Sequence, residues 1–197
     1  MTKESEKVLC VEAASDFPNW QGITREIPLS FIENLVHERG EFLERGEVED
    51  NPSFKQIIPY VLFRHKEKFF LMQRLPKHSD TRLSSKFSLG IGGHVNPEDV
   101  ERESIIDMSM REFSEEVDYS GDLDFSYLGL LYDGSDAVGQ VHLGVVLIAN
   151  GESDEIVIRN EHKQGRMLTL SEIRQYYDEM ENWSRIVYDS LTSESQI

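Results

Sequence analysis

Apolar and polar residues follow two different spacings along this chain, and these spacings predict its strands and helices. Short apolar-rich runs bounded by turn residues predict strands. These runs are residues 8–13, 57–63, 68–74, 87–93, 125–132, 141–149, 155–158 and 166–168. Apolar residues at helical spacing predict helices over residues 30–39, 104–116, 169–180 and 183–191. Strands outnumber the helices that flank them, which indicates an α/β or α+β fold with a mixed sheet.

Capping patterns mark three of the predicted helix starts. In each, a serine or threonine is followed three residues later by an acidic residue. The pairs are Ser30 with Glu33, Ser104 with Asp107, and Thr169 with Glu172. Asn96-Pro97 offers an alternative start for the second of these helices. The acidic stretch 41–50 predicts a loop or linker, so we expect an accessory segment over 1–54 and a main domain over 55–197.

The helix predicted from Ser104 carries an apolar stripe beside a cluster of carboxylates. At roughly 100° per residue, the stripe contains Ile106, Met110, Phe113 and Val117. The carboxylates of Glu112, Glu115 and Glu116 lie roughly a third of a turn away and repel one another by about 0.2–0.5 kcal/mol per pair. Hard divalent cations take oxygen ligands, so the cluster predicts a site for Mg²⁺ or Mn²⁺.

Gly93, Glu103 and the run from Arg111 to Val117 together resemble the Nudix box of the diphosphate hydrolases. That box reads Gly, five residues, Glu, seven residues, then Arg-Glu-apolar-x-Glu-Glu-x-Gly-apolar. Seven residues separate Glu103 from Arg111, and the glutamates that follow are in register. The resemblance implies a Nudix α/β/α sandwich and a metal-dependent hydrolase of a nucleoside diphosphate linked to another moiety.

Two positions depart from the box. Five residues after Gly93 comes Asp99 rather than glutamate, so the loop from this glycine to Glu103 is four residues longer than in the pattern. Asp118 also replaces the glycine that usually ends the helix. Aspartate visits the left-handed conformation more easily than most residues, so we expect the turn to survive.

The resemblance assigns roles to the box residues. The metal ligands would be Glu112, Glu115 and Glu116. Arg111 would orient Glu112, while Gly93 and Glu103 would brace the entry to the helix, with Asp99 as the alternative brace. The general base would be Glu112 or, in a later loop, Glu161.

Substrate phosphates also require cations, and these are concentrated in residues 55–86. Within that stretch the expected phosphate contacts are Arg74 and either Arg82 or Lys86. The alternative for each of them is a solvated side chain on the surface of a hairpin. His94, next to the glycines, either contacts the substrate or forms a structural hydrogen bond.

Charge and cysteine content exclude other classes. The net charge of −17 opposes binding to nucleic acid or to an anionic membrane surface, and no apolar run is long enough to span a membrane. The one cysteine, Cys10, lies between apolar residues and is expected to be a buried thiol in a cytoplasmic protein. The expected partner is a small nucleotide derivative, and a homodimer could form through 1–54 or the C-terminal helices. The alternative function is a nucleotide-sensing module without catalysis, although the three retained glutamates favour an enzyme.

Overall fold

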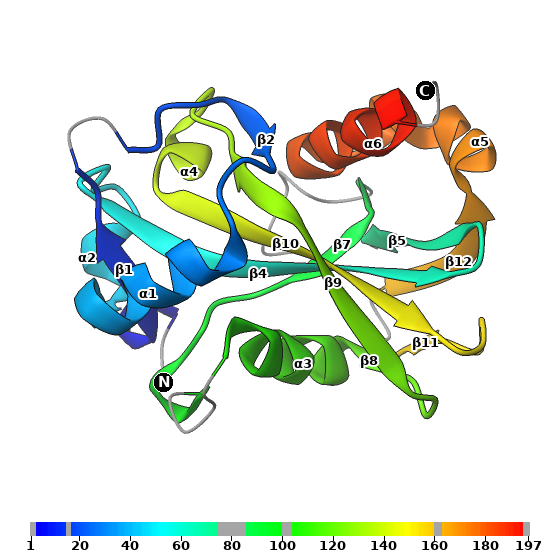
Figure 1. The fold of residues 1–197 in the computed structure, drawn as a ribbon, viewed down its shortest axis with the longest axis horizontal. Coiled ribbons are helices and arrows are strands. Elements are labelled where there is room, and N and C mark those ends of the chain that lie inside the picture. Colours follow the sequence, from blue (N-terminus) through cyan, green and yellow to red (C-terminus); the bar gives the residue numbers. More distant parts are fainter. Residues whose placement is uncertain (1–2, 15–16, 75–85, 100–103, 160–162, 195–197) are drawn as a thin grey trace. The chain divides into compact units, whose positions relative to one another are not determined.

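The computed structural model describes residues 3–14, 17–74, 86–99, 104–159 and 163–194. Its elements form a mixed α+β fold, as the sequence predicts (Figure 1). The strands are β1 (Lys7–Glu12), β2 (Gly22–Thr24), β3 (Gly40–Glu44), β4 (Phe54–His65), β5 (Lys68–Arg74), β6 (Phe87–Ser88), β7 (Gly90–Gly92), β8 (Val117–Asp118), β9 (Leu123–Tyr132), β10 (His142–Gly151), β11 (Val157–Ile158) and β12 (Lys163–Thr169).

The helices are α1 (Leu29–Arg39), α2 (Arg45–Val48), α3 (Ile105–Glu116), α4 (Ala137–Gln140), α5 (Leu170–Ile173) and α6 (Asn182–Glu194). Short 3₁₀ turns are η1 (Lys3–Ser5), η2 (Pro97–Asp99) and η3 (Arg174–Glu179). Within the described residues, no helix is both long and apolar enough to cross a membrane.

The larger sheet is mixed, with the strand order β12-β5-β4-β10-β9-β2. Strand β1 pairs antiparallel with both β3 and β4, and β5 pairs antiparallel with β12, β4 and β6. Strands β4 and β10 run parallel, because Gln56 N donates to Val141 O near their starts and Arg64 reaches the side chain of Asn150 near their ends. A separate two-stranded sheet pairs β11 with β8.

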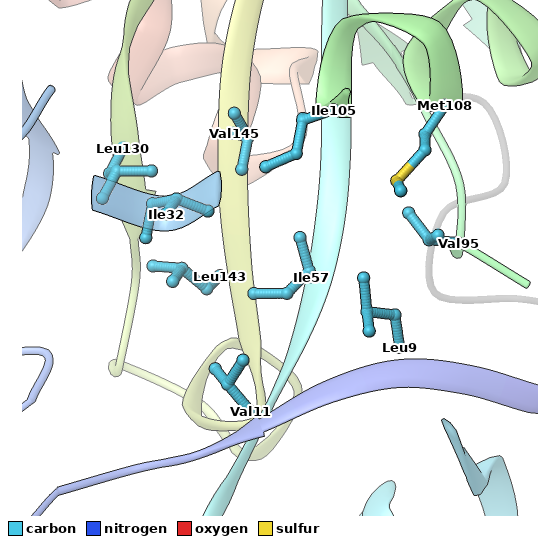
Figure 2. Close-up of a cluster of buried hydrophobic side chains, with 10 residues drawn as sticks. All are labelled: Leu9, Val11, Ile32, Ile57, Val95, Ile105, Met108, Leu130, Leu143 and Val145. Carbon is cyan, nitrogen blue, oxygen red and sulfur yellow. The ribbon is translucent and has the colours of Figure 1, made fainter. Parts of the chain in front are cut away.

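The chain divides into two compact units. The first comprises Met1–Tyr60, Gly92–Glu112 and Tyr127–Leu147. Figure 2 shows its main core, in which Ile32 of α1 and Ile105 and Met108 of α3 lie among side chains of the sheet. Burying one such side chain contributes about 1.5–3 kcal/mol. The cluster is Leu9, Val11, Ile32, Ile57, Val95, Ile105, Met108, Leu130, Leu143 and Val145. All of residues 1–54 belong to this unit, and the boundary predicted after residue 54 stays a prediction.

The second unit comprises Val61–Ile91, Phe113–Ser126 and Ile148–Ile197. Its core contains Val61, Phe63, Phe70, Met72, Ile91, Phe113, Val117, Ala149 and Ile156. Helix α6 and the residue before it are joined to the segment of β6 by hydrogen bonds: Leu89 N donates to Ser184 Oγ at 2.9 Å, and Ser88 Oγ donates to Glu181 Oε1 at 2.6 Å. These bonds anchor the short strand β6, which precedes Gly90, Gly92 and Gly93.

The predicted loop over 41–50 is wrong, because this stretch contains β3 and α2. Strand β3 pairs along β1, with Leu9 opposite Phe42. Arg45, the first residue of α2, forms ion pairs with Glu6 and Glu49 at 3.0 and 2.8 Å. Strand pairing and ion pairs therefore stabilise β3 and α2 in a stretch whose composition is typical of loops.

Two of the three capping predictions are confirmed. Thr169 and Glu172 form a complete capping box, although α5 ends at Ile173 and continues as the 3₁₀ turn η3. Asp107 N donates to Ser104 Oγ at 3.2 Å at the start of α3. The Ser30 prediction is wrong, because α1 begins at Leu29 after Pro28 and has no side-chain cap.

The apolar stripe predicted for α3 is only partly correct. Phe113 and Val117 are buried, but Ile106 is half-buried and Met110 is 41% exposed. The buried face instead includes Ile105, Met108 and the carboxylate-bearing Glu112. The helix is therefore rotated so that Glu112 lies at its inner face.

Replacing Gln56 with leucine is expected to stabilise the protein. Gln56 is fully buried on β4, and neither amide atom of its side chain has a hydrogen-bond partner among the described residues. An unsatisfied buried polar group costs about 1–3 kcal/mol, so Gln56→Leu should raise the free energy of unfolding by a similar amount in urea denaturation. The control, Gln175→Leu on the exposed side of η3, should change it by less than about 0.5 kcal/mol. A loss of stability in Gln56→Leu would contradict the expectation.

Candidate functional site

The segment after β7 belongs to the first unit and is held there by hydrogen bonds of its backbone. Leu9 N of β1 donates to Val95 O at 2.9 Å, and the Val95 side chain lies in the core. Asn96 N then donates to Asp99 Oδ2 at 2.8 Å, and Asp99 N returns a bond to Asn96 O at 2.9 Å. Residues 95–99, which follow the glycine that opens the box, are therefore held in place by hydrogen bonds.

Arg111 on α3 connects this segment to the glutamates. Its Nε donates to Asp99 Oδ1 at 2.5 Å, and its Nη2 donates to Glu112 Oε1 at 2.5 Å and to His94 O at 3.1 Å. Asp99 is completely buried. A guanidinium with two carboxylates makes strong, directional hydrogen bonds, so Arg111 fixes the Glu112 carboxylate in place.

Gly93 lies directly against Glu112. A Cβ atom at Gly93 would stand 1.9 Å from Glu112 Oε2 and 2.3 Å from its Cδ. No other amino acid fits there unless the carboxylate moves. The glycine that opens the box is therefore required by the position of Glu112.

Changing Gly93 to alanine is expected to displace Glu112 and lower catalytic turnover. Loss of a group that orients a metal ligand typically reduces activity 10–100-fold, and we expect about tenfold in kcat here because the displaced atoms belong to a flexible side chain. The measurement is steady-state hydrolysis of the diphosphate substrate that the resemblance implies, with Mg²⁺ or Mn²⁺ at saturation. Gly92→Ala is the control, since its Cβ would approach Tyr60 and Pro59 at 3.0 and 3.1 Å but not Glu112. An equal loss in both variants would exclude the Glu112 contact as the cause.

The metal-ligand prediction concerns three glutamates of α3. Glu112 is 9% exposed, Glu116 is half-buried and Glu115 is exposed. Within the part of the chain that the structure describes, no three His, Cys, Asp or Glu side chains already converge on one point. The donors nevertheless fit a hard divalent cation, because all three are carboxylates of one helix and Gly93 leaves room for the Glu112 carboxylate. Ligation by all three would need their side chains to turn toward one another.

The end of α3 differs from the expected left-handed turn. Asp118 belongs to β8, and among the described non-glycine residues only Lys66 has a positive φ, of 53°. Arg159 forms an ion pair with Asp118, and its backbone N donates to Glu116 O at 3.0 Å. The strand pairing of β8 with β11 therefore replaces the glycine turn of the pattern.

The remaining predicted site residues are described to different extents. Glu103, Arg82 and Glu161 lie outside the described residues. Arg74 is the last residue of β5, where its backbone pairs with Lys163. Lys86 is half-buried and directly precedes β6. The structure brings together Gly93, His94, Arg111 and Glu112, and it places Asp99 among them.

Two further groups bear on the sequence predictions. Burial raises the pKa of the Cys10 thiol to about 12, so it stays protonated near neutral pH, as expected of a structural thiol. His142 was not predicted as a site residue, yet its ring lies 5.6 Å from the ring of His94. No local sequence signal marks this residue, because the contact joins distant parts of the chain.

Comparison with known proteins places the fold among solved structures. No protein-family model matches the chain. Protein YmaB of Bacillus subtilis strain 168 is 33% identical over 158 residues, which cover 76% of this chain and 77% of YmaB. The crystal structure of Tm1382, a candidate Nudix hydrolase, is similar with a TM-score of 0.80 and 29% identity over 94% of this chain and 98% of Tm1382.

A more distant structure has the same fold. The Nudix domain of NrtR from Shewanella oneidensis, in complex with ADP ribose, has a TM-score of 0.56 and 14% identity over 71% of this chain and 88% of that one. The fold, the box residues and the relatives lead to one assignment: the chain belongs to the Nudix hydrolase family.

Proposed function

We propose that this protein hydrolyses a nucleoside diphosphate linked to another moiety, using Mg²⁺ or Mn²⁺ held by Glu112, Glu115 and Glu116. The observation that carries the proposal is the arrangement of Arg111 between Asp99 and Glu112, with Gly93 packed on the same carboxylate. This arrangement orients a ligand carboxylate before any metal binds, which reduces the cost of assembling the site.

Each group of residues would have a separate role in the reaction. A bound divalent cation would neutralise phosphate oxygens and lower the pKa of the attacking water. Arg111 holds Glu112, and either Glu112 or Glu161 would accept the proton of that water. Arg74, Arg82 and Lys86 would bind the phosphates that repel the nucleophile. The net charge of −17 makes such local cations necessary for an anionic substrate.

The rival function is a nucleotide-sensing module that binds without hydrolysis. Both functions need a nucleotide site, but only the enzyme needs the full set of glutamates on α3. That set is complete here, which supports catalysis. NrtR, whose Nudix domain is known in complex with ADP ribose, makes ADP-ribose the first ligand to test for either function.

A substrate screen distinguishes the two functions. ADP-ribose, dinucleoside polyphosphates, nucleotide sugars and damaged nucleoside triphosphates are incubated with the protein and Mg²⁺ or Mn²⁺, and released nucleotide is measured. Binding of each compound is measured in parallel by calorimetry. Turnover of at least one compound, abolished by chelator, supports the proposal. Tight binding of a compound without turnover of any would overturn it in favour of the sensing module.

A further inference from the structure

His142 is held in one orientation at the start of β10. It is 8% exposed, and its Nδ1 lies 2.6 Å from Val138 O of α4. A carbonyl oxygen only accepts, so Nδ1 carries the proton of this bond. The adjacent peptide is also fixed, because Val141 O accepts a hydrogen bond from Gln56 N of β4 at 2.7 Å. The bond to Val138 therefore orients the imidazole ring, and the bond from β4 holds the backbone that carries it.

The ring of His142 meets the segment that carries the box. Its centroid lies 5.6 Å from that of His94, at an interplanar angle of 68°, which is an edge-to-face contact. The backbone oxygen of His94 is one of the acceptors of Arg111, and Arg111 donates to Glu112. A series of contacts therefore connects α4 with Glu112: Val138 O contacts the His142 ring, which contacts the His94 ring, and His94 O and Glu112 share Arg111.

Burial favours the uncharged form of the His142 ring. Burial lowers the pKa of His142 and outweighs the opposing effects of the Val138 hydrogen bond and of Glu49 and Asp136, while Arg45 lowers the pKa further. A neutral ring packs against His94 without placing another positive charge near the Arg111 guanidinium.

We propose that His142 is a positioning residue for the Nudix site, which acts by fixing the His94 ring and thereby the carbonyl that helps Asp99 hold Arg111 against Glu112. Its effect on turnover depends on the proposed function. Its effect on Arg111 does not, and can be observed in the protein without metal or substrate.

His65 provides a matched control on another strand. Its Nδ1 makes the same kind of bond, to Gly151 O at 2.8 Å, and it lies in the second unit at the end of β4. In both His142→Asn and His65→Asn, the amide nitrogen of asparagine can replace the Nδ1 donor while the ring is removed. Only the first substitution removes a ring from His94.

The first readout is the Nε–H resonance of Arg111 in ¹⁵N-labelled protein, with its rate of hydrogen exchange. Because Nε donates to the buried Asp99 at 2.5 Å, this proton should exchange slowly in the wild type. His142→Asn should shift the resonance and raise the exchange rate, whereas His65→Asn should leave both unchanged. The second readout is kcat, which should fall about threefold to tenfold in His142→Asn and stay at the wild-type value in His65→Asn.

A third variant tests the ring itself. His142→Phe keeps a ring against His94 and loses the Nδ1 donor, so it should recover most of the turnover and the Arg111 resonance that His142→Asn loses. Equal losses in the phenylalanine and asparagine variants would overturn the ring contact as the cause. If the Arg111 resonance does not shift in His142→Asn, the proposal is overturned whatever the activity. It is also overturned if the resonance shifts while the turnover of an active enzyme stays unchanged. A shifted resonance in a protein that hydrolyses none of the diphosphates would refute the proposed function and leave the positioning of Arg111 standing.

Discussion

Glu116→Gln is expected to lower kcat for diphosphate hydrolysis about 100-fold to 1,000-fold. Glu116 is the last residue of α3, one helical turn after Glu112, and is one of the three proposed metal ligands. The amide of glutamine keeps the size of the side chain but loses its negative charge. A metal contribution of several kcal/mol to transition-state stabilisation, at about 1.4 kcal/mol per factor of ten, gives the expected range.

Mn²⁺ binding and thermal stability accompany the kinetic measurement. The Mn²⁺ affinity of Glu116→Gln should fall, and its melting temperature without metal should stay close to that of the wild type, because the Glu116 side chain is only half-buried. Glu38→Gln is the control, since Glu38 is an exposed glutamate of α1 outside the box. Full activity of Glu116→Gln would show that the metal assignment is wrong even if the protein is a hydrolase.

Local patterns predicted the strands that are marked by a buried apolar run and the helix that is marked by a capping box. The apolar runs located β4, β5, β9 and β10, and the Thr169 capping box begins α5 as expected. Strand β3 was missed because its stability comes from pairing with β1, and residue composition cannot report a partner strand. The apolar stripe of α3 was predicted only in part: Phe113 and Val117 are buried, but Glu112 lies at the inner face, held by Arg111, and Met110 is exposed.

In the candidate site, too, some features could be predicted from local patterns and others could not. The register of the glutamates on one helix can be predicted from a repeat of 3.6 residues per turn, since the helix fixes their relative directions. The carboxylate that pairs with Arg111 cannot be predicted in this way. Glu103 and Asp99 both precede the helix, and the longer loop changes which of them lies close to Arg111. The structure gives Asp99 as a partner of Arg111, while Glu103 lies outside the described residues. His142 depends on contacts between α4, β10 and residues 93–95, which no local pattern contains.

Asp99→Asn should therefore affect both stability and turnover more than Glu103→Gln. Asp99 is completely buried, accepts from Arg111 Nε at 2.5 Å and from Asn96 N at 2.8 Å, and belongs to the segment that packs on Glu112. Hydrogen bonds to a charged group contribute about 1.5–3 kcal/mol, so the free energy of unfolding should fall by about this amount in urea denaturation. Loosening Arg111 also removes the orientation of Glu112, for which we expect a loss of about 100-fold in kcat.

The comparison of Asp99 with Glu103 tests how this chain accommodates its longer loop. If Asp99 occupies the bracing position, the four extra residues follow the brace and Glu103 has no bracing role. Glu103→Gln should then keep kcat within about twofold of the wild type and change the free energy of unfolding by less than about 0.5 kcal/mol. Asp99→Glu restores the residue type of the box and the charge, so it should recover part of the loss seen in Asp99→Asn. The reverse result, with Glu103→Gln inactive and Asp99→Asn nearly normal, would show that the brace is set by its distance from Arg111 along the sequence. The contact between Asp99 and Arg111 would then serve only to close the loop.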